Sequence, residues 1–290
     1  MRILFHLGLN KCASTYIQRA LDRAHANLRS AGVWYPWEAG TAAAHYGLSR
    51  HYGFGPMADD VMPVSLADLI AEARLAGCQR MVLSSEYLSL YAPRAVARLM
   101  ADIHAAQAEA EFLLYSRPVE PWVRSLFNQY VKTVDGGQPL ANIDAFARRV
   151  LTNGALDLTK RIGQWQHAAG NEALSLYRIE DRTPADAVLA PIEAFAGISL
   201  AGSVPARMNA SLDPDRLHAI GVLRQQAPSP ARERALSLLL AGRGQPAPAP
   251  AGYLDLSDTV CRQLSDEIAG PAQTFPWRSL HGHDLVAKAA

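Results

Sequence analysis

Residues 2–15 read Arg-Ile-Leu-Phe-His-Leu-Gly-Leu-Asn-Lys-Cys-Ala-Ser-Thr, and this stretch decides the fold. The apolar run over 2–9 predicts a buried parallel strand, because strands covered on both faces are apolar almost throughout. Apolar residues at helical spacing follow over 14–31, and Ser14 is a suitable residue to cap that helix. A strand, a short loop and a helix in this order are typical of an α/β protein.

The alternation of strands and helices continues through the first two thirds of the chain. This order predicts a three-layer α/β fold, in which a mostly parallel central sheet is flanked by helices. Ligands of such sheets bind beyond the carboxyl ends of the strands. The chain after residue 178 is predicted to be helical, with one loop over the Gly/Pro/Ala-rich residues 242–252. Further strands are expected over 80–84, 111–116 and 173–178, and further helices over 65–77, 93–108, 119–134, 142–151 and 156–169.

Length and composition set bounds on the class of protein. The chain has 290 residues, of which 49% are hydrophobic, and we expect a single domain with an irregular insertion over about 33–63. A formal net charge of +1 argues against a nucleic-acid binder, whose domain would carry a basic excess. The chain has three scattered cysteines, no signal-peptide pattern and no long apolar run. These features predict a cytoplasmic protein without a membrane span.

The loop over residues 8–15 is the first candidate site. Backbone N–H groups at the start of a helix bind anions, Lys11 adds a mobile cation, and Ser14 and Thr15 add hydroxyl groups. The order of residues is not that of a Walker A loop, because Lys11 precedes the small residues. The alternative is an ordinary strand–helix turn in which Ser14 is only a cap.

Two further polar groups follow predicted strands. Arg117 ends one strand, and Ser125 lies eight residues later on the next helix, so that a guanidinium and a hydroxyl could together bind a phosphate monoester. Glu86 follows another strand, where a carboxylate could act as a general base. The alternatives are an exposed arginine before a helix and a carboxylate that only favours a helix N-terminus.

Together and in this order, the three clusters resemble the family of sulfotransferases that use 3′-phosphoadenosine 5′-phosphosulfate (PAPS). Residues 10–15 resemble that family's 5′-phosphosulfate loop, the Arg117–Ser125 spacing resembles its 3′-phosphate site, and residues 176–181 resemble its later Tyr-Glu-Asp strand. The resemblance extends from residue 2 to about 181 and implies a P-loop-like fold, with PAPS as co-substrate and PAP as product. It implies donor-binding roles for Lys11, Cys12, Ala13, Ser14, Thr15, Arg117 and Ser125.

The resemblance also implies a mechanism for the site. Lys11 would stabilise charge on the oxygen that leaves with the phosphate, and Glu86 would take the proton of the acceptor. His45, in the aromatic insertion, is the competing base, and the alternative for it is a loop imidazole with a local hydrogen bond. The sequence shows no metal-ligand spacing, so we expect metal-independent transfer.

Other functions remain open from the sequence alone. A nucleotide kinase-like phosphotransferase shares the strand–loop–helix arrangement, and a non-catalytic PAP- or nucleotide-binding protein would keep the same phosphate ligands. The acceptor, a small molecule or a carbohydrate hydroxyl or amine, cannot be identified, and the oligomeric state is open. Two C-terminal segments, 243–244 and 278–282, are candidates to close over the nucleotide.

Overall fold

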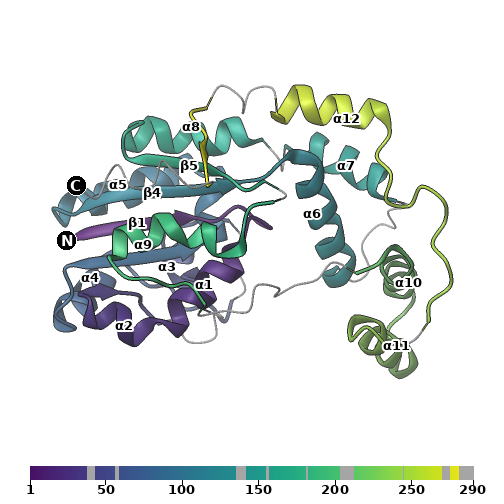
Figure 1. The fold of residues 1–290 in the computed structure, drawn as a ribbon, viewed down its shortest axis with the longest axis horizontal. Coiled ribbons are helices and arrows are strands. Elements are labelled where there is room, and N and C mark those ends of the chain that lie inside the picture. The colour runs from purple at the N-terminus through teal and green to yellow at the C-terminus, as the bar shows by residue number, and fades with distance from the viewer. Residues whose placement is uncertain are drawn as a thin grey trace. The chain divides into compact units, whose positions relative to one another are not determined.

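The computed structural model describes residues 1–37, 43–55, 59–134, 142–154, 157–180, 182–202, 212–243, 245–269 and 275–280. The chain divides into two compact units (Figure 1). The first comprises Met1–Pro118, Leu158–Met208 and Ala272–Ala290, and the second comprises Val119–Asp157 and Asn209–Pro271. The expectation of a single domain over 1–290 stays a prediction.

A six-stranded sheet is the centre of the first unit, and all of its strand pairs are parallel. The strand order is β2-β3-β1-β4-β5-β6, so the first strand of the chain lies in the interior of the sheet. This confirms the predicted α/β class. The strands are β1 (Arg2–Leu7), β2 (Val33–Trp34), β3 (Arg80–Ser85), β4 (Glu109–Ser116), β5 (Leu174–Arg178) and β6 (Arg278–Ser279).

Helices cover both faces of this sheet, and successive side chains of each strand point to opposite faces. On one face Phe5 stacks on Phe112 at 5.2 Å between ring centroids, and Trp165 of α8 (Leu158–Ala169) packs on Phe112 at 4.8 Å. On the other face, the next residue of β1, His6, contacts Ser84. α1 (Ser14–Arg23) lies on that face, so the sheet is the middle of three layers.

The remaining elements of the first unit follow the predicted pattern with a few differences. The helix expected over 14–31 is interrupted at Ala24, and the irregular insertion contains a helix of its own. The short strands β2 and β6 were not expected, since two residues carry no measurable periodicity. The helices are α2 (His25–Ser30), α3 (Tyr46–Tyr52), α4 (Leu66–Leu75), α5 (Pro93–Ala105), α9 (Ala190–Ala196), and the 3₁₀ helices η1 (Glu86–Ser89) and η2 (Ala185–Leu189).

The described part of the second unit is helical. Its core includes Phe127, whose ring lies 5.4 Å from that of Phe146 and 5.6 Å from that of Tyr253. The chain before Tyr253 contains the loop predicted over 242–252, whose described residues form neither helix nor strand. The helices are α6 (Val119–Thr133), α7 (Ile143–Thr152), α10 (Pro214–Gln225), α11 (Pro230–Leu240), α12 (Asp258–Leu264) and the short η3 (Ser265–Ala269).

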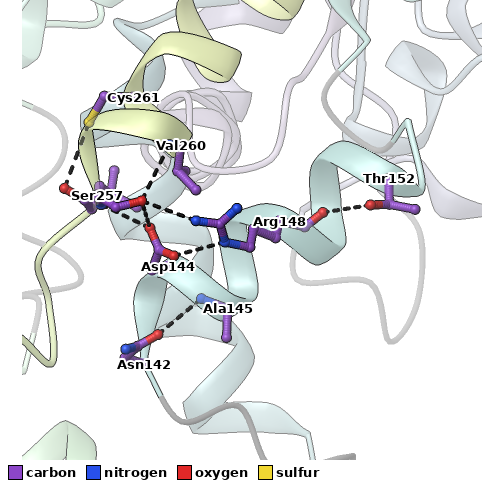
Figure 2. Close-up of polar contacts among 9 residues, drawn as sticks. Asn142, Asp144, Ala145, Arg148, Thr152, Ser257, Val260 and Cys261 are labelled. Carbon is purple, nitrogen blue, oxygen red and sulfur yellow. Dashed lines mark hydrogen bonds and ion pairs between the residues drawn. The ribbon is translucent and has the colours of Figure 1, made fainter.

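A carboxylate joins two helices of this second unit (Figure 2). Oδ1 of Asp144, on α7, accepts hydrogen bonds from the amide of Ser257 at 2.8 Å and from its hydroxyl at 2.7 Å. Ser257 is the N-cap of α12, and Arg148 donates to the other oxygen of Asp144 at 2.9 Å. One side chain therefore fixes the start of α12 against α7. Throughout the described chain, each helix is too short or too polar to traverse a lipid bilayer.

Candidate functional site

The loop after β1 packs directly against the residue that follows β3. A Cβ atom on Gly8 would lie 2.5 Å from the Ser14 hydroxyl and 3.3 Å from Cα of Glu86, so only glycine fits there without displacement. Ser89 donates a hydrogen bond to the Gly8 carbonyl at 2.8 Å and fixes the same approach from η1. The structure thus places the loop beside Glu86, two groups that the sequence separates by more than seventy residues.

Two non-glycine residues of the loop have left-handed backbone conformations. Lys11 has φ 68° and Ala13 has φ 65°, a region in which Cβ crowds the following carbonyl oxygen. Ala13, and not the expected Ser14, is the N-cap of α1, and among the described residues no side chain caps this helix. Ser14 is instead its first residue, and its buried hydroxyl donates to the Leu9 carbonyl at 3.4 Å. The prediction that Ser14 caps the helix is wrong, since its hydroxyl turns back into the loop.

The open helix start is suited to an anion. The first amides of an α-helix have no partner within the helix, and here the amides of Ser14 and Thr15 donate no backbone hydrogen bond to any described residue. The helix dipole adds partial positive charge at the same end. Strained backbone of this kind is concentrated at ligand sites, where surrounding structure holds it in place.

Arg117 lies at the edge of this loop. It follows β4, the neighbour of β1, and its guanidinium donates to the Lys11 carbonyl at 3.4 Å. Its Nε is buried and has no hydrogen-bond partner among the described residues. A buried donor without a partner is costly, so this nitrogen is available to an anionic ligand.

Cys12 lies between these cationic and strained residues, and its thiol is buried. Burial raises the pKa of Cys12 to about 12, although nearby Arg117 opposes the shift. The thiol therefore stays protonated at neutral pH and is a poor nucleophile. Any part of Cys12 in donor binding would come from its backbone.

The carboxylate of Glu86 is held by two residues that the sequence analysis did not identify. Its Oε2 accepts hydrogen bonds from Nε2 of Gln18 at 3.2 Å and from the hydroxyl of Tyr46 at 3.3 Å. Burial, together with the negative charge of Glu86, raises the pKa of Tyr46, so its phenol stays protonated and donates. One sequence feature could have identified Gln18: its polar side chain lies between the apolar residues Ile17 and Leu21 on the buried side of α1.

His45, the competing candidate base, is engaged elsewhere. It is fully buried, its Nδ1 accepts the Ser84 amide at 2.8 Å, and its Nε2 donates to the Pro36 carbonyl at 3.0 Å. Burial lowers the pKa of His45 to about 4, although the Pro36 and Ser84 carbonyls near the ring oppose this shift, so the ring stays neutral. Because both nitrogens bind the backbone, we infer that His45 anchors its segment to β3 and has no free nitrogen for an acceptor proton.

For the remaining candidate residues, Ser125 and the two C-terminal segments, the structure gives positions for only some. Ser125 is half-buried on α6 in the second unit, so its pairing with Arg117, in the first unit, stays a prediction. Arg278 lies on β6, opposite Tyr177, and Arg243 is exposed after α11. Residues 244, 281 and 282 fall outside the described part of the chain, so closure over the nucleotide by either segment also stays a prediction. Among the described residues, His, Cys, Asp and Glu form no group of three or more that could hold a metal ion.

Comparison with known proteins gives one structural likeness. No protein-family model matches the chain, and no curated protein does. A crystal structure of a sulfotransferase from Alicyclobacillus acidocaldarius aligns over 83% of this chain and 96% of its own, with 16% sequence identity and a TM-score of 0.44. A likeness this distant assigns no function to the chain.

Proposed function

We propose that the chain is a sulfotransferase that moves a sulfuryl group from PAPS to a hydroxyl or amine of an acceptor and releases PAP. The observation that carries the proposal is the position of Arg117. Its Nε is buried without a partner among the described residues and lies beside a strained loop and a helix start that no described side chain caps, and all three favour an anion. A donor with phosphate at both the 5′ and 3′ positions has anionic groups for the helix start and for Arg117.

The reaction needs charge stabilisation at the oxygen that bridges sulfur and phosphorus. The acceptor oxygen forms a bond to sulfur as the bond from sulfur to the bridging oxygen breaks, and PAP leaves with that electron pair. Lys11 and the amides of Ser14 and Thr15 are on the loop that would meet the leaving phosphate. Donors fixed in advance of the reaction stabilise such developing charge without reorganisation, which supports this assignment.

The acceptor must also lose a proton. In the proposed reaction the proton passes to the carboxylate of Glu86, whose Oε2 is already engaged by two donors. The other oxygen, Oε1, would receive the proton. The approach of Gly8 to Cα of Glu86 supports a base next to the donor loop, and the buried ring of His45 does not offer one.

The proposal is tested by incubating the protein with PAPS and a panel of phenol, alcohol, amine and carbohydrate acceptors. Mass spectrometry should find an acceptor that gains one SO₃ group, with release of one PAP for each product formed. Transfer of phosphate from ATP without any use of PAPS would instead show a nucleotide kinase. Binding of PAP without any turnover would indicate a nucleotide-binding protein.

A further inference from the structure

A chain of buried polar side chains runs from the sheet to the Glu86 carboxylate. His6 and Ser84 lie opposite each other on β1 and β3, with Nδ1 of His6 2.8 Å from the Ser84 hydroxyl oxygen. Nε2 of Gln18 donates to that hydroxyl oxygen at 3.2 Å and also to Oε2 of Glu86 at 3.2 Å. Gln18 is 3% exposed, so its amide has few alternatives to these two acceptors.

Burial keeps the first member of this chain uncharged. Burial lowers the pKa of His6 to about 3, so the imidazole is neutral. The Ser84 hydroxyl oxygen has two lone pairs, so with either tautomer of the neutral His6 ring it can accept from Nε2 of Gln18. Ser84 therefore stays an acceptor for Gln18, and the amide nitrogen of Gln18 is kept turned toward Glu86.

We propose that Gln18 and Tyr46 are positioning residues that hold the Glu86 carboxylate for its reaction, with Gln18 oriented by Ser84 and His6. This inference rests on the proposed function. Both donors meet the same oxygen from different elements, α1 and α3, and so fix the plane of the carboxylate as well as its place. With Oε2 occupied, Oε1 is the atom that receives the acceptor proton. A base misplaced by even a small distance loses much of its effect on the rate.

The experiment uses PAPS with water as the acceptor, so that no acceptor need be known, and follows the release of PAP in single turnovers. Gln18→Met removes the amide at nearly constant shape, and Tyr46→Phe removes only the hydroxyl. Each should slow PAP release about tenfold and leave the Kd for PAP within about twofold of the original value. Each is also made in a Glu86→Gln background, where the further loss should be less than about twofold, because residues that act as a unit are not additive.

Tyr52→Phe is the matched control for Tyr46→Phe. Tyr52 lies on the same helix α3 and donates to a carboxylate, that of Asp102, at 2.6 Å. Its loss should lower stability without changing the rate in either background. If this variant slows release as much as Tyr46→Phe, the effect comes from the stability of α3 and the proposal is wrong.

The outcomes separate this inference from the proposed function. If the unaltered protein neither binds PAP nor releases it from PAPS, the proposed function fails, and the inference fails with it. If Glu86→Gln releases PAP at the original rate, the base is misassigned while the sulfotransferase proposal stands. A third outcome is that Glu86→Gln is slow while Gln18→Met and Tyr46→Phe slow PAP release by the same factor in the Glu86→Gln background as in the unaltered protein. In that case only the positioning role is overturned.

Discussion

Ala13 shows how a single residue stores strain at the candidate donor loop. Its φ of 65° costs an L-residue with a Cβ atom about 1–2 kcal/mol, whereas glycine adopts this conformation freely. We therefore expect Ala13→Gly to raise the free energy of unfolding by about 1 kcal/mol, measured by urea denaturation.

Ala71, an exposed residue inside α4, supplies the matched control. Glycine in a helix interior costs about 1 kcal/mol relative to alanine, so Ala71→Gly should lower the same free energy. Opposite signs for the two substitutions support strain at Ala13. A loss of stability at both positions would show that the loop is not strained in solution.

Lys11 is proposed to stabilise the transition state of sulfuryl transfer. Its partner would be charge that appears on the bridging oxygen only as the bond to sulfur breaks. Lys11→Ala should therefore lower kcat by about 10²–10³-fold and weaken PAP binding far less. The rate of PAP release and the Kd for PAP, measured on the same variant, test this. A normal kcat with only a raised KM for PAPS would mean that Lys11 binds the ground state alone.

At the level of elements, the contact between α7 and α12 gives a prediction about pH (Figure 2). Partial burial acts to raise the pKa of Asp144, but the hydrogen bonds from Ser257 and the charge of Arg148 outweigh it and hold the pKa below its usual range. A depressed pKa in the folded state stabilises the protein above the ordinary value, 3.8, and this stability is lost as the pH falls through the folded value.

Asp144→Asn should therefore destabilise the protein at neutral pH and reduce the loss of stability as the pH falls below 3.8. Ser257→Ala removes the α12 cap and should cost about 1 kcal/mol. Thermal unfolding of both variants against pH tests this. An unchanged acid profile for Asp144→Asn would show that another carboxylate governs the loss.

Some strands and helix boundaries could be located from local sequence patterns, and others could not. The apolar runs of β1, β3, β4 and β5 fixed their positions closely, because buried parallel strands leave little room for polar residues. The break at Ala24 was not predictable, since no glycine or proline marks it. Ser14 was expected as the cap because serine favours that position, but the left-handed Ala13 precedes it and ends the loop.

At the level of the whole molecule, topology determines what the sequence could predict about the site. Residues at the ends of parallel strands meet at one edge of a sheet, so the approach of Arg117 and Glu86 to the loop could be expected from their positions directly after predicted strands. The contacts of Gln18 and Tyr46 with Glu86 depend on how α1 and α3 pack on the sheet. Helical periodicity predicts the buried side of a helix, but not which atom a buried amide meets.

We propose that this protein has a site for a nucleotide with a 3′-phosphate, and that Arg117 is part of it. Isothermal titration calorimetry with PAP and with adenosine 5′-monophosphate, which lacks that phosphate, tests it most directly. The protein should prefer PAP, and Arg117→Ala should weaken PAP binding by roughly 10- to 150-fold, with little change for the monophosphate. Arg2→Ala, at the opposite end of β1 and exposed, should alter neither affinity. Equal affinities of the unaltered protein for the two nucleotides, or an equal loss for both in Arg117→Ala, would contradict the account.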